Sequence, residues 1–195
     1  AEKDFVPCQE FMQSGQTFAR YSALSSDLAL VSLRVNAALK AVDPAHYQNA
    51  EKLRSALESR FPFVKAVNAV DPLVYEGREI LFNIQKEVHI DRQDPPLSWV
   101  ADLALGRHTG GHLVLPQLGL RIRLEPGDMI MLRGRIIRHG VEDWEGGQRI
   151  SMPHFTHSST WRMMDMASLV GLKDLESGEE NGGMVDGVSD TDDIL

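Results

Sequence analysis

The sequence lacks several features that assign proteins to specialised classes. It holds one cysteine, Cys8, in 195 residues, which excludes an intramolecular disulfide and favours a reducing compartment. No apolar run approaches the roughly 20 residues that a membrane-spanning helix needs. No signal peptide is visible from Ala1 onward. We therefore expect an intracellular protein that does not associate with membranes.

Basic side chains are lacking at one end of the chain, and the imbalance between acidic and basic residues is confined to that end. Residues 174–195 contain eight acidic and no basic side chains, so they account for the whole net charge of −8. This segment is also rich in glycine, and we expect it to form a disordered acidic tail. The neutral remainder neither requires nor excludes a nucleic-acid partner, for which a strongly basic surface would have argued.

Apolar spacing predicts helices in the first part of the chain. One helix is expected over residues 28–41, with Ser25-Ser26-Asp27 as its cap. A second is expected over residues 45–60, where Asp43 would cap the helix, Pro44 would lie in its first turn and Pro62 would end it. We assign residues 1–72 to a helical lead that packs on the remainder of the protein.

From about residue 73 the apolar pattern alternates, which is typical of strands. Gly-, Pro- and Asp-containing turns separate these segments and predict an antiparallel sandwich or barrel. We assign residues 73–173 to this β-rich core and residues 174–195 to the tail. The expected strands are Val74–Phe82, Gln85–Asp91, Trp99–Leu105, Gly111–Leu115, Leu120–Leu124, Met129–Arg133, Ile136–His139 and Arg149–Thr156.

Three potential metal ligands stand out in the β-rich part. His89 and Asp91 are two residues apart in an expected strand, so their side chains should share a face. His139 follows 50 residues after His89. Two histidines and one carboxylate form the facial triad of non-haem Fe(II) oxygenases, which leaves positions open for a co-substrate and O2. Zinc uses similar donors, but the helical His-Glu-x-x-His signature is absent, and the pattern favours iron.

An arginine and an asparagine complete the predicted co-substrate site. A guanidinium binds a carboxylate through two parallel hydrogen bonds, so Arg149 is the expected anchor of 2-oxoglutarate. Asn83 would share the face of His89 and Asp91 in a regular strand, and we expect it to line the co-substrate pocket. Gln85 and Glu87 share that face too, but they are equally compatible with the solvent-exposed face of an edge strand. The pattern predicts an Fe(II)/2-oxoglutarate-dependent dioxygenase.

The chain from about residue 77 to 161 carries a further set of motifs. These are His89-x-Asp91-x-x-Asp94, Gly110-Gly111, Leu113-x-Leu115-Pro116, Pro126-Gly127-Asp128, His139 and Arg149-x-Ser151-x-x-x-Phe155-x-His157. With them the segment resembles the core of the 2-oxoglutarate/Fe(II) dioxygenases. It is most similar to fungal and protist members of the Tet/JBP group, which oxidise the methyl group of 5-methylcytosine or thymine in DNA.

The resemblance implies a fold and a set of site residues. The fold would be α+β and mainly β, a double-stranded β-helix (jelly-roll or cupin-like) with the N-terminal helices packed on one sheet. His89, Asp91 and His139 would bind iron, and Arg149, helped by Ser151, would bind 2-oxoglutarate. O2 would be the second co-substrate. The oxidation of C–H groups would release succinate and CO2.

The resemblance also implies a pocket for a flipped cytosine. Phe155 would stack on the base, His157 would hydrogen-bond to it, and Asp94 would accept a hydrogen bond from its amino group. Phe155 and His157 share strand parity with Arg149, which independently aims them at one pocket, and readers of flipped bases use such side chains. In the plainer interpretation, Phe155 belongs to the core and Asp94 caps the turn at Pro95-Pro96.

Three functional classes follow. The first is a monomeric DNA dioxygenase that acts on 5-methylcytosine in the nucleus, in DNA demethylation. The second is a 2-oxoglutarate dioxygenase that hydroxylates a small molecule or a protein side chain. The third, a binding module on an inactive β-helix, is disfavoured by the intact ligand set. The concentrated positive charge would contact DNA phosphates or lie on solvated strand faces; it comprises Arg121, Arg123, Arg133, Arg135 and Arg138.

Overall fold

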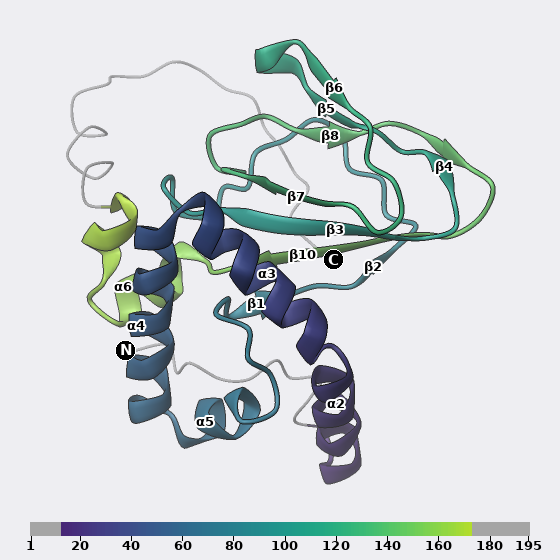
Figure 1. The fold of residues 1–195 in the computed structure, drawn as a ribbon. Helices are drawn as coiled ribbons and strands as arrows, with labels where there is room; N and C mark the ends of the chain where they lie inside the picture. Colours follow the sequence, from purple (N-terminus) through teal and green to yellow (C-terminus); the bar gives the residue numbers. More distant parts are fainter. Residues whose placement is uncertain (1–12, 173–195) are drawn as a thin grey trace.

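Helices form the first part of the chain in the computed structural model, which describes residues 13–172 (Figure 1). The predicted acidic tail lies outside the described residues. The four leading helices are α2 (Gly15–Asp27), α3 (Ala29–Val42), α4 (Pro44–Arg60) and α5 (Pro62–Asn68). Within the described part, no helix combines the length and apolar character that crossing a bilayer would require.

The helix boundaries follow local capping chemistry. Asp43 caps α4 as predicted, because its carboxylate accepts a hydrogen bond of 2.9 Å from the backbone N–H of His46. The cap predicted at Ser25-Ser26-Asp27 is wrong. Those residues lie inside α2, which begins after Ser14, and α3 starts without a side-chain cap. Pro62 lies in the first turn of α5, a position that suits its fixed backbone angle.

Ten short strands follow, and every pairing between them is antiparallel. Helix α6 (Ser158–Met163) and the 3-10 turns η1 (Pro116–Leu118) and η2 (Ala167–Val170) complete the described chain. The strands are β1 (Gly77–Arg78), β2 (Leu81–Phe82), β3 (Val100–Gly106), β4 (Thr109–Gly110), β5 (Leu113–Leu115), β6 (Leu120–Ile122), β7 (Met129–Leu132), β8 (Gly140–Val141), β9 (Trp144–Glu145) and β10 (Arg149–Phe155).

These strands form three sheets. The largest has the order β1-β10-β3-β7, with β2 also paired to β10. A three-stranded sheet has the order β6-β5-β8, and β4 pairs with β9. The combination of helices and antiparallel sheets agrees with the predicted α+β class. The pairing within residues 13–172 does not close into a barrel.

The prediction of a regular strand over Gln85–Asp91 is wrong. Asn83 has a positive φ of 55°, which breaks the alternation of side chains before the segment begins. Only His89 pairs, in an isolated antiparallel bridge with His139. The strand expected over Ile136–His139 is replaced by a turn, in which the N–H of Ile136 donates to the carbonyl of Arg133 at 2.9 Å.

The large sheet separates the helices from the three-stranded sheet. Figure 1 shows α3 and α4 on one side of β3 and β10, with β5, β6 and β8 on the other. The interface with α3 is apolar, since Val35 and Leu39 pack in one cluster with Leu103 and Met152. Burial of each large side chain of this kind contributes roughly 1.5–3 kcal/mol. The prediction that the N-terminal helices pack on one sheet agrees with this arrangement; the domain boundary at residue 72 stays a prediction.

A buried polar network ties α3 to the sheet beneath it. Arg78 on β1 pairs with Asp71 at 2.7 Å and donates to the hydroxyl of Ser32 on α3. Its Nε also donates to Nε2 of His154 on β10, at 3.0 Å. His154 in turn donates from Nδ1 to the carbonyl of Ala101 at 3.0 Å. The network therefore connects one helix, the three neighbouring strands β1, β10 and β3, and the loop before β1.

Substitution of Asp71 by alanine tests this network. The variant would leave the Arg78 guanidinium buried without its carboxylate, because the two side chains are only 11% and 8% exposed. Loss of one partner from a buried pair typically costs about 3–5 kcal/mol, and we expect the free energy of unfolding to fall by that amount. Urea denaturation measures it. Glu125→Ala, which removes the exposed partner of Arg123, is the control and should unfold as the unmodified protein does.

Candidate metal and co-substrate site

The three predicted metal ligands meet at one point. One donor atom from each of His89, Asp91 and His139 lies within 4.8 Å of the others. The bridge between His89 and His139 produces this meeting: each N–H donates to the other's carbonyl, at 2.9 and 3.0 Å. The two imidazole rings consequently lie 4.5 Å apart between centroids. Residues 50 positions apart are thus held side by side by two backbone hydrogen bonds.

Both histidines are oriented so that their outer nitrogens face Asp91. Nδ1 of His89 lies 2.7 Å from the carbonyl of Glu87, and Nδ1 of His139 lies 2.9 Å from the carbonyl of Ile137. A carbonyl only accepts, so each Nδ1 carries the proton and each Nε2 keeps a lone pair. Hydrogen bonds of this type orient metal-binding histidines in proteins.

The carboxylate of Asp91 lies between the two histidines. Its oxygens are 3.4 Å from Nε2 of His89 and 3.6 Å from Nε2 of His139. Donors bound at right angles about 2.1 Å from a metal lie about 3 Å apart, so small movements would complete a facial site. Burial opposes ionisation of Asp91, but its close contacts with His89 and His139 lower its pKa below the usual value. These surroundings therefore favour the ionised carboxylate of Asp91, the form that binds a metal.

Gly134 makes room for this carboxylate. A Cβ atom at Gly134 would overlap with Oδ2 of Asp91 and lie 2.9 Å from its Cγ. The carbonyl of Gly134 also accepts a 2.9 Å hydrogen bond from the N–H of Asp91. The turn that replaces the expected strand before His139 thus supplies both the space and the backbone contact that position Asp91.

Arg149 is buried on β10 with part of its guanidinium unpaired. The residue is 2% exposed, and among the described residues neither its Nε nor its Nη2 has a hydrogen-bond partner. Its guanidinium lies over the ring of Trp144, 5.7 Å from the centroid. Burial lowers the pKa of Arg149, and the nearby Asp102 partly counters this. A buried cation with unmet donors suits an anionic ligand.

Ser151 and Asn83 lie beside Arg149, but their polar groups already have partners. The hydroxyl of Ser151 donates to the carboxylate of Asp102 on β3, whose oxygens are 2.8 and 2.9 Å away. The side-chain oxygen of Asn83 accepts from the backbone N–H of Arg149 at 2.9 Å. Asn83 thus positions the strand residue that carries the guanidinium. Direct roles of Ser151 and Asn83 in co-substrate binding stay predictions.

The three predicted substrate residues are also close together. Phe155 and His157 stack with ring centroids 4.6 Å apart and planes 17° apart. Nε2 of His157 lies 3.9 Å from the carboxylate of Asp94. The N–H of Asp94 donates to the carbonyl of Asp91 at 3.1 Å, which joins this cluster to the metal-ligand turn. Burial and the negative charge of Asp91 raise the pKa of Asp94 to about 7.

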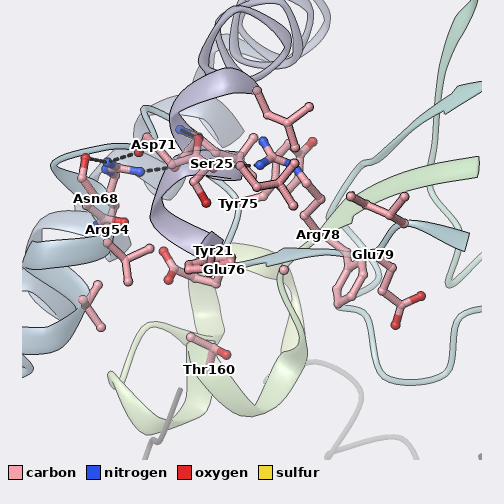
Figure 2. A pocket seen from close by; sticks show the side chains of 18 of the residues that line it. Tyr21, Ser25, Arg54, Asn68, Asp71, Tyr75, Glu76, Arg78, Glu79 and Thr160 are labelled. Atoms are coloured by element: carbon pink, nitrogen blue, oxygen red, sulfur yellow. Dashed lines mark hydrogen bonds and ion pairs between the residues drawn. The ribbon is translucent and has the colours of Figure 1, made fainter. Parts of the chain in front are cut away.

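A cavity of about 750 Å³ lies beside this cluster, between the helices and β1. Phe155 and His157 contribute to its lining. Figure 2 shows Arg54 and Asn68 at one side of the cavity and Arg78 and Glu79 at the other. Its volume is in the range of small-molecule pockets, and its lining mixes apolar and charged groups.

The arginines predicted to contact phosphates differ in availability. Arg121 pairs with Glu142 at 2.7 Å, and Arg123 pairs with Glu125. Arg133 lies over the ring of Trp99 and 3.7 Å from Asp43. Across residues 13–172, no ion pair involves Arg135 or Arg92, and Arg135 donates to the carbonyl of Arg92, next to Asp91. Arg135, a member of the predicted cluster, and Arg92, which is not, therefore lie next to the turn that carries Asp91.

Sequence analysis missed four residues of this site. Asp102 lies in an apolar-rich strand, and Trp144 lies in the two-residue strand β9, which is too short to show a pattern. Gly134 acts through a missing side chain, which no pattern of side chains reveals. His108 is buried against the charge of Arg149. The one signal in the sequence was the histidine itself, which could not be distinguished from a core residue.

Comparison with known proteins finds a similarity among solved structures. No protein-family model matches the chain, and no curated protein matches it. Among solved structures, the chain is similar to part of NgTET1, solved in complex with 5mC DNA. The TM-score is 0.42 and the sequence identity 20%, over 48% of this chain and 38% of NgTET1.

Substitution of Gly134 by alanine tests how Asp91 is positioned. The backbone of Gly134 lies outside the left-handed region, so alanine fits the main chain, but its methyl group would displace the Asp91 carboxylate. Changes around metal ligands typically weaken metal binding 10- to 100-fold, and we expect a loss of about tenfold or more in Mn(II) affinity by calorimetry. Gly15→Ala is the control, because its added Cβ meets nothing within 4 Å. Equal Mn(II) affinities in both variants would contradict this account of Asp91.

Proposed function

We propose that this protein is an Fe(II)/2-oxoglutarate-dependent dioxygenase that oxidises a C–H group, with 5-methylcytosine in DNA as its substrate. The observation that carries the proposal is the convergence of His89, Asp91 and His139, together with a buried arginine, Arg149, that has unmet donors. The proposed scaffold is a double-stranded β-helix core, with which the antiparallel pairing of the strands is compatible.

The metal-binding part of the proposal rests on the donor set. His89 and His139 would bind Fe(II) through Nε2, and Asp91 would bind it through one carboxylate oxygen. Two neutral imidazoles and one carboxylate leave a divalent iron with residual positive charge and open positions, which suits an anionic co-substrate. When bound, the iron would activate O2 for the oxidation of a C–H bond with decarboxylation of 2-oxoglutarate to succinate and CO2.

The co-substrate part rests on Arg149. Its guanidinium would bind the distal carboxylate of 2-oxoglutarate through Nε and Nη2, the two atoms that have no partner within residues 13–172. Asn83 would hold the backbone at this position. Trp144 would cover one face of the guanidinium and keep water away from it. Ser151, held by Asp102, would offer its oxygen as a further polar contact.

The substrate part rests on Asp94, Phe155 and His157. Phe155 would stack on a flipped base, and His157 and Asp94 would bind its hydrogen-bonding edge. The direct contact between Asp94 and Asp91 would bring that base close to the metal. Unpaired Arg92 and Arg135 lie near the same turn and would contact phosphates on either side of the flipped nucleotide.

A second candidate function is the hydroxylation of a small molecule or a protein side chain. The 750 Å³ cavity favours it, because Phe155 and His157 line a space that offers charged groups of both signs. In this alternative, the metal and co-substrate residues keep their roles and DNA is not needed. The two candidates are distinguished by whether methylated DNA stimulates turnover.

Succinate formation tests the proposed chemistry. We expect the purified protein, with Fe(II), 2-oxoglutarate and ascorbate, to form succinate faster when DNA with 5-methylcytosine is present. Oxidised cytosine should then be detected by mass spectrometry. Asp91→Ala removes the carboxylate ligand of the triad and should reduce succinate to the metal-free background. Asp165→Asn, an exposed acid whose φ of 56° asparagine tolerates, is the control and should retain turnover.

The outcomes separate the candidate functions. Substantial succinate formation by Asp91→Ala would contradict the metal assignment. Turnover that ignores DNA would support the small-molecule or protein substrate instead.

Charge removal tests the DNA contact. We expect the double variant Arg92→Gln/Arg135→Gln to bind duplex DNA several-fold more weakly at low salt. Removal of each phosphate-binding arginine should reduce the slope of log affinity against log salt by about one. Fluorescence anisotropy measures both quantities. Arg121→Gln/Arg123→Gln is the matched control, since both side chains are already paired with carboxylates. A greater reduction of affinity in the control pair would place the DNA over Arg121 and Arg123 instead.

A further inference from the structure

Buried polar atoms without partners are concentrated at one place. The described residues contain nine such side-chain atoms, and five of them belong to His108, His112 and Arg149. A buried donor or acceptor that stays unpaired costs about 1–3 kcal/mol. Proteins satisfy nearly all such groups, so a concentration of unmet donors points to a ligand.

His108 lies on the turn that faces Arg149. It follows β3, whose last residue, Gly106, is paired with Arg149 on β10. The next residue, Arg107, donates from its N–H to the carbonyl of Gln148 at 2.9 Å. These contacts fix the turn against the strand that carries the guanidinium. His108 is only 9% exposed, and burial together with the charge of Arg149 lowers its pKa, which favours the neutral imidazole.

Three other histidines have hydrogen-bonded rings, in contrast to His108. His154 is fully buried, and both of its ring nitrogens are hydrogen-bonded, one to Ala101 and one to Arg78. His89 and His139 each donate from Nδ1 to a backbone carbonyl. Neither ring nitrogen of His108 has a partner within residues 13–172. A neutral imidazole always carries one N–H donor, and here that donor is unmet.

The surroundings of Arg149 leave room for a bound group. Gly111 has a positive φ of 65°, and a Cβ atom there would lie 3.2 Å from Nε of Arg149. The chain therefore keeps a glycine where any side chain would press on the guanidinium. An N–H donor and a planar cation, both buried and both unmet, match a carboxylate, which accepts up to four hydrogen bonds.

We propose that His108 is a second binding residue for the co-substrate and donates a hydrogen bond to the carboxylate held by Arg149. This inference rests on the proposed function, because it takes the ligand of Arg149 to be 2-oxoglutarate. The two residues have different roles, since Arg149 supplies charge and a planar pair of donors, whereas His108 supplies a directional neutral donor. Arg149 alone would bind any carboxylate, but the pair fixes the rotation of the bound group.

Direct binding of 2-oxoglutarate tests the role of His108. Calorimetry on the full chain, with Mn(II) in place of iron and without O2, separates binding from turnover. Loss of a hydrogen bond to a charged group weakens binding about tenfold or more, and we expect this for His108→Phe. His108→Gln restores an N–H donor and should bind within about threefold of the unmodified protein. Mn(II) affinity should be the same in all three proteins.

A spectroscopic measurement covers the case in which His108→Phe does not fold. The ring nitrogens of the unmodified protein, labelled with 15N-histidine, are observed by NMR while 2-oxoglutarate is added. The signals that disappear in His108→Gln belong to His108. We expect these signals to shift on binding and the His154 signals to stay in place.

Each outcome has a distinct meaning. Unchanged 2-oxoglutarate affinity in His108→Phe, or unshifted His108 signals at saturation, would overturn the inference and leave the proposed function intact. If the unmodified protein binds no 2-oxoglutarate, the proposed co-substrate is wrong. Succinate and inorganic phosphate are then the probes: binding that depends on His108 would keep it as an anion donor, and its absence would overturn that role as well.

Discussion

The antiparallel bridge between His89 and His139 is the contact on which the site depends. It is isolated, so no neighbouring ladder holds these residues in register. Two backbone hydrogen bonds bring both imidazoles to one side and place Asp91 and Gly134 opposite each other. The rest of the fold supports this bridge indirectly, because β8 continues from His139 and pairs with β5 in the three-stranded sheet.

Buried polar groups serve two purposes in this protein. The network of Arg78, Asp71, Ser32 and His154 is fully paired and joins the helices to the large sheet. Arg149 and His108, on the opposite side of that sheet from α3, retain unmet donors. Strand alternation produces the contrast: along β10, Arg149 and Ser151 face one side while Met152 and His154 face the other. One strand therefore carries both a structural and a binding face.

Much of this arrangement could be predicted from the sequence. The helices α3 and α4, the strands β3, β7 and β10 and the three potential metal ligands follow from apolar periodicity, from the capping role of Asp43 and from the ligand chemistry. The strand around His89 was predicted wrongly, because the alternation of side chains was read through Asn83, whose backbone turns the other way. Helix α6 was missed because its six residues are too few to show a helical period.

Contacts between distant segments explain the remaining omissions. The value of Gly134 lies in the space that it leaves for Asp91, which is 43 residues earlier in the chain. Asp102 gains its role only when β3 pairs with β10 and brings it to Ser151. Neither relation leaves a periodic or local signature. Both depend on pairings that form only in the folded chain.

The isolated bridge also has a consequence for dynamics. Residues 83–87 before it are exposed and belong to no strand. Isolated hydrogen bonds hold this segment, such as those from the N–H of Asn83 to the carbonyl of Arg149 and from the N–H of Val141 to the carbonyl of Lys86. A metal bound to both histidines and to Asp91 would join two chain segments as a cross-link does, and the added stability would rise with the logarithm of the free metal concentration above the dissociation constant. Closing of the bridge between His89 and His139 and assembly of the metal site would then be the same equilibrium. Amide exchange at His89 and His139 would follow the concentration of free metal.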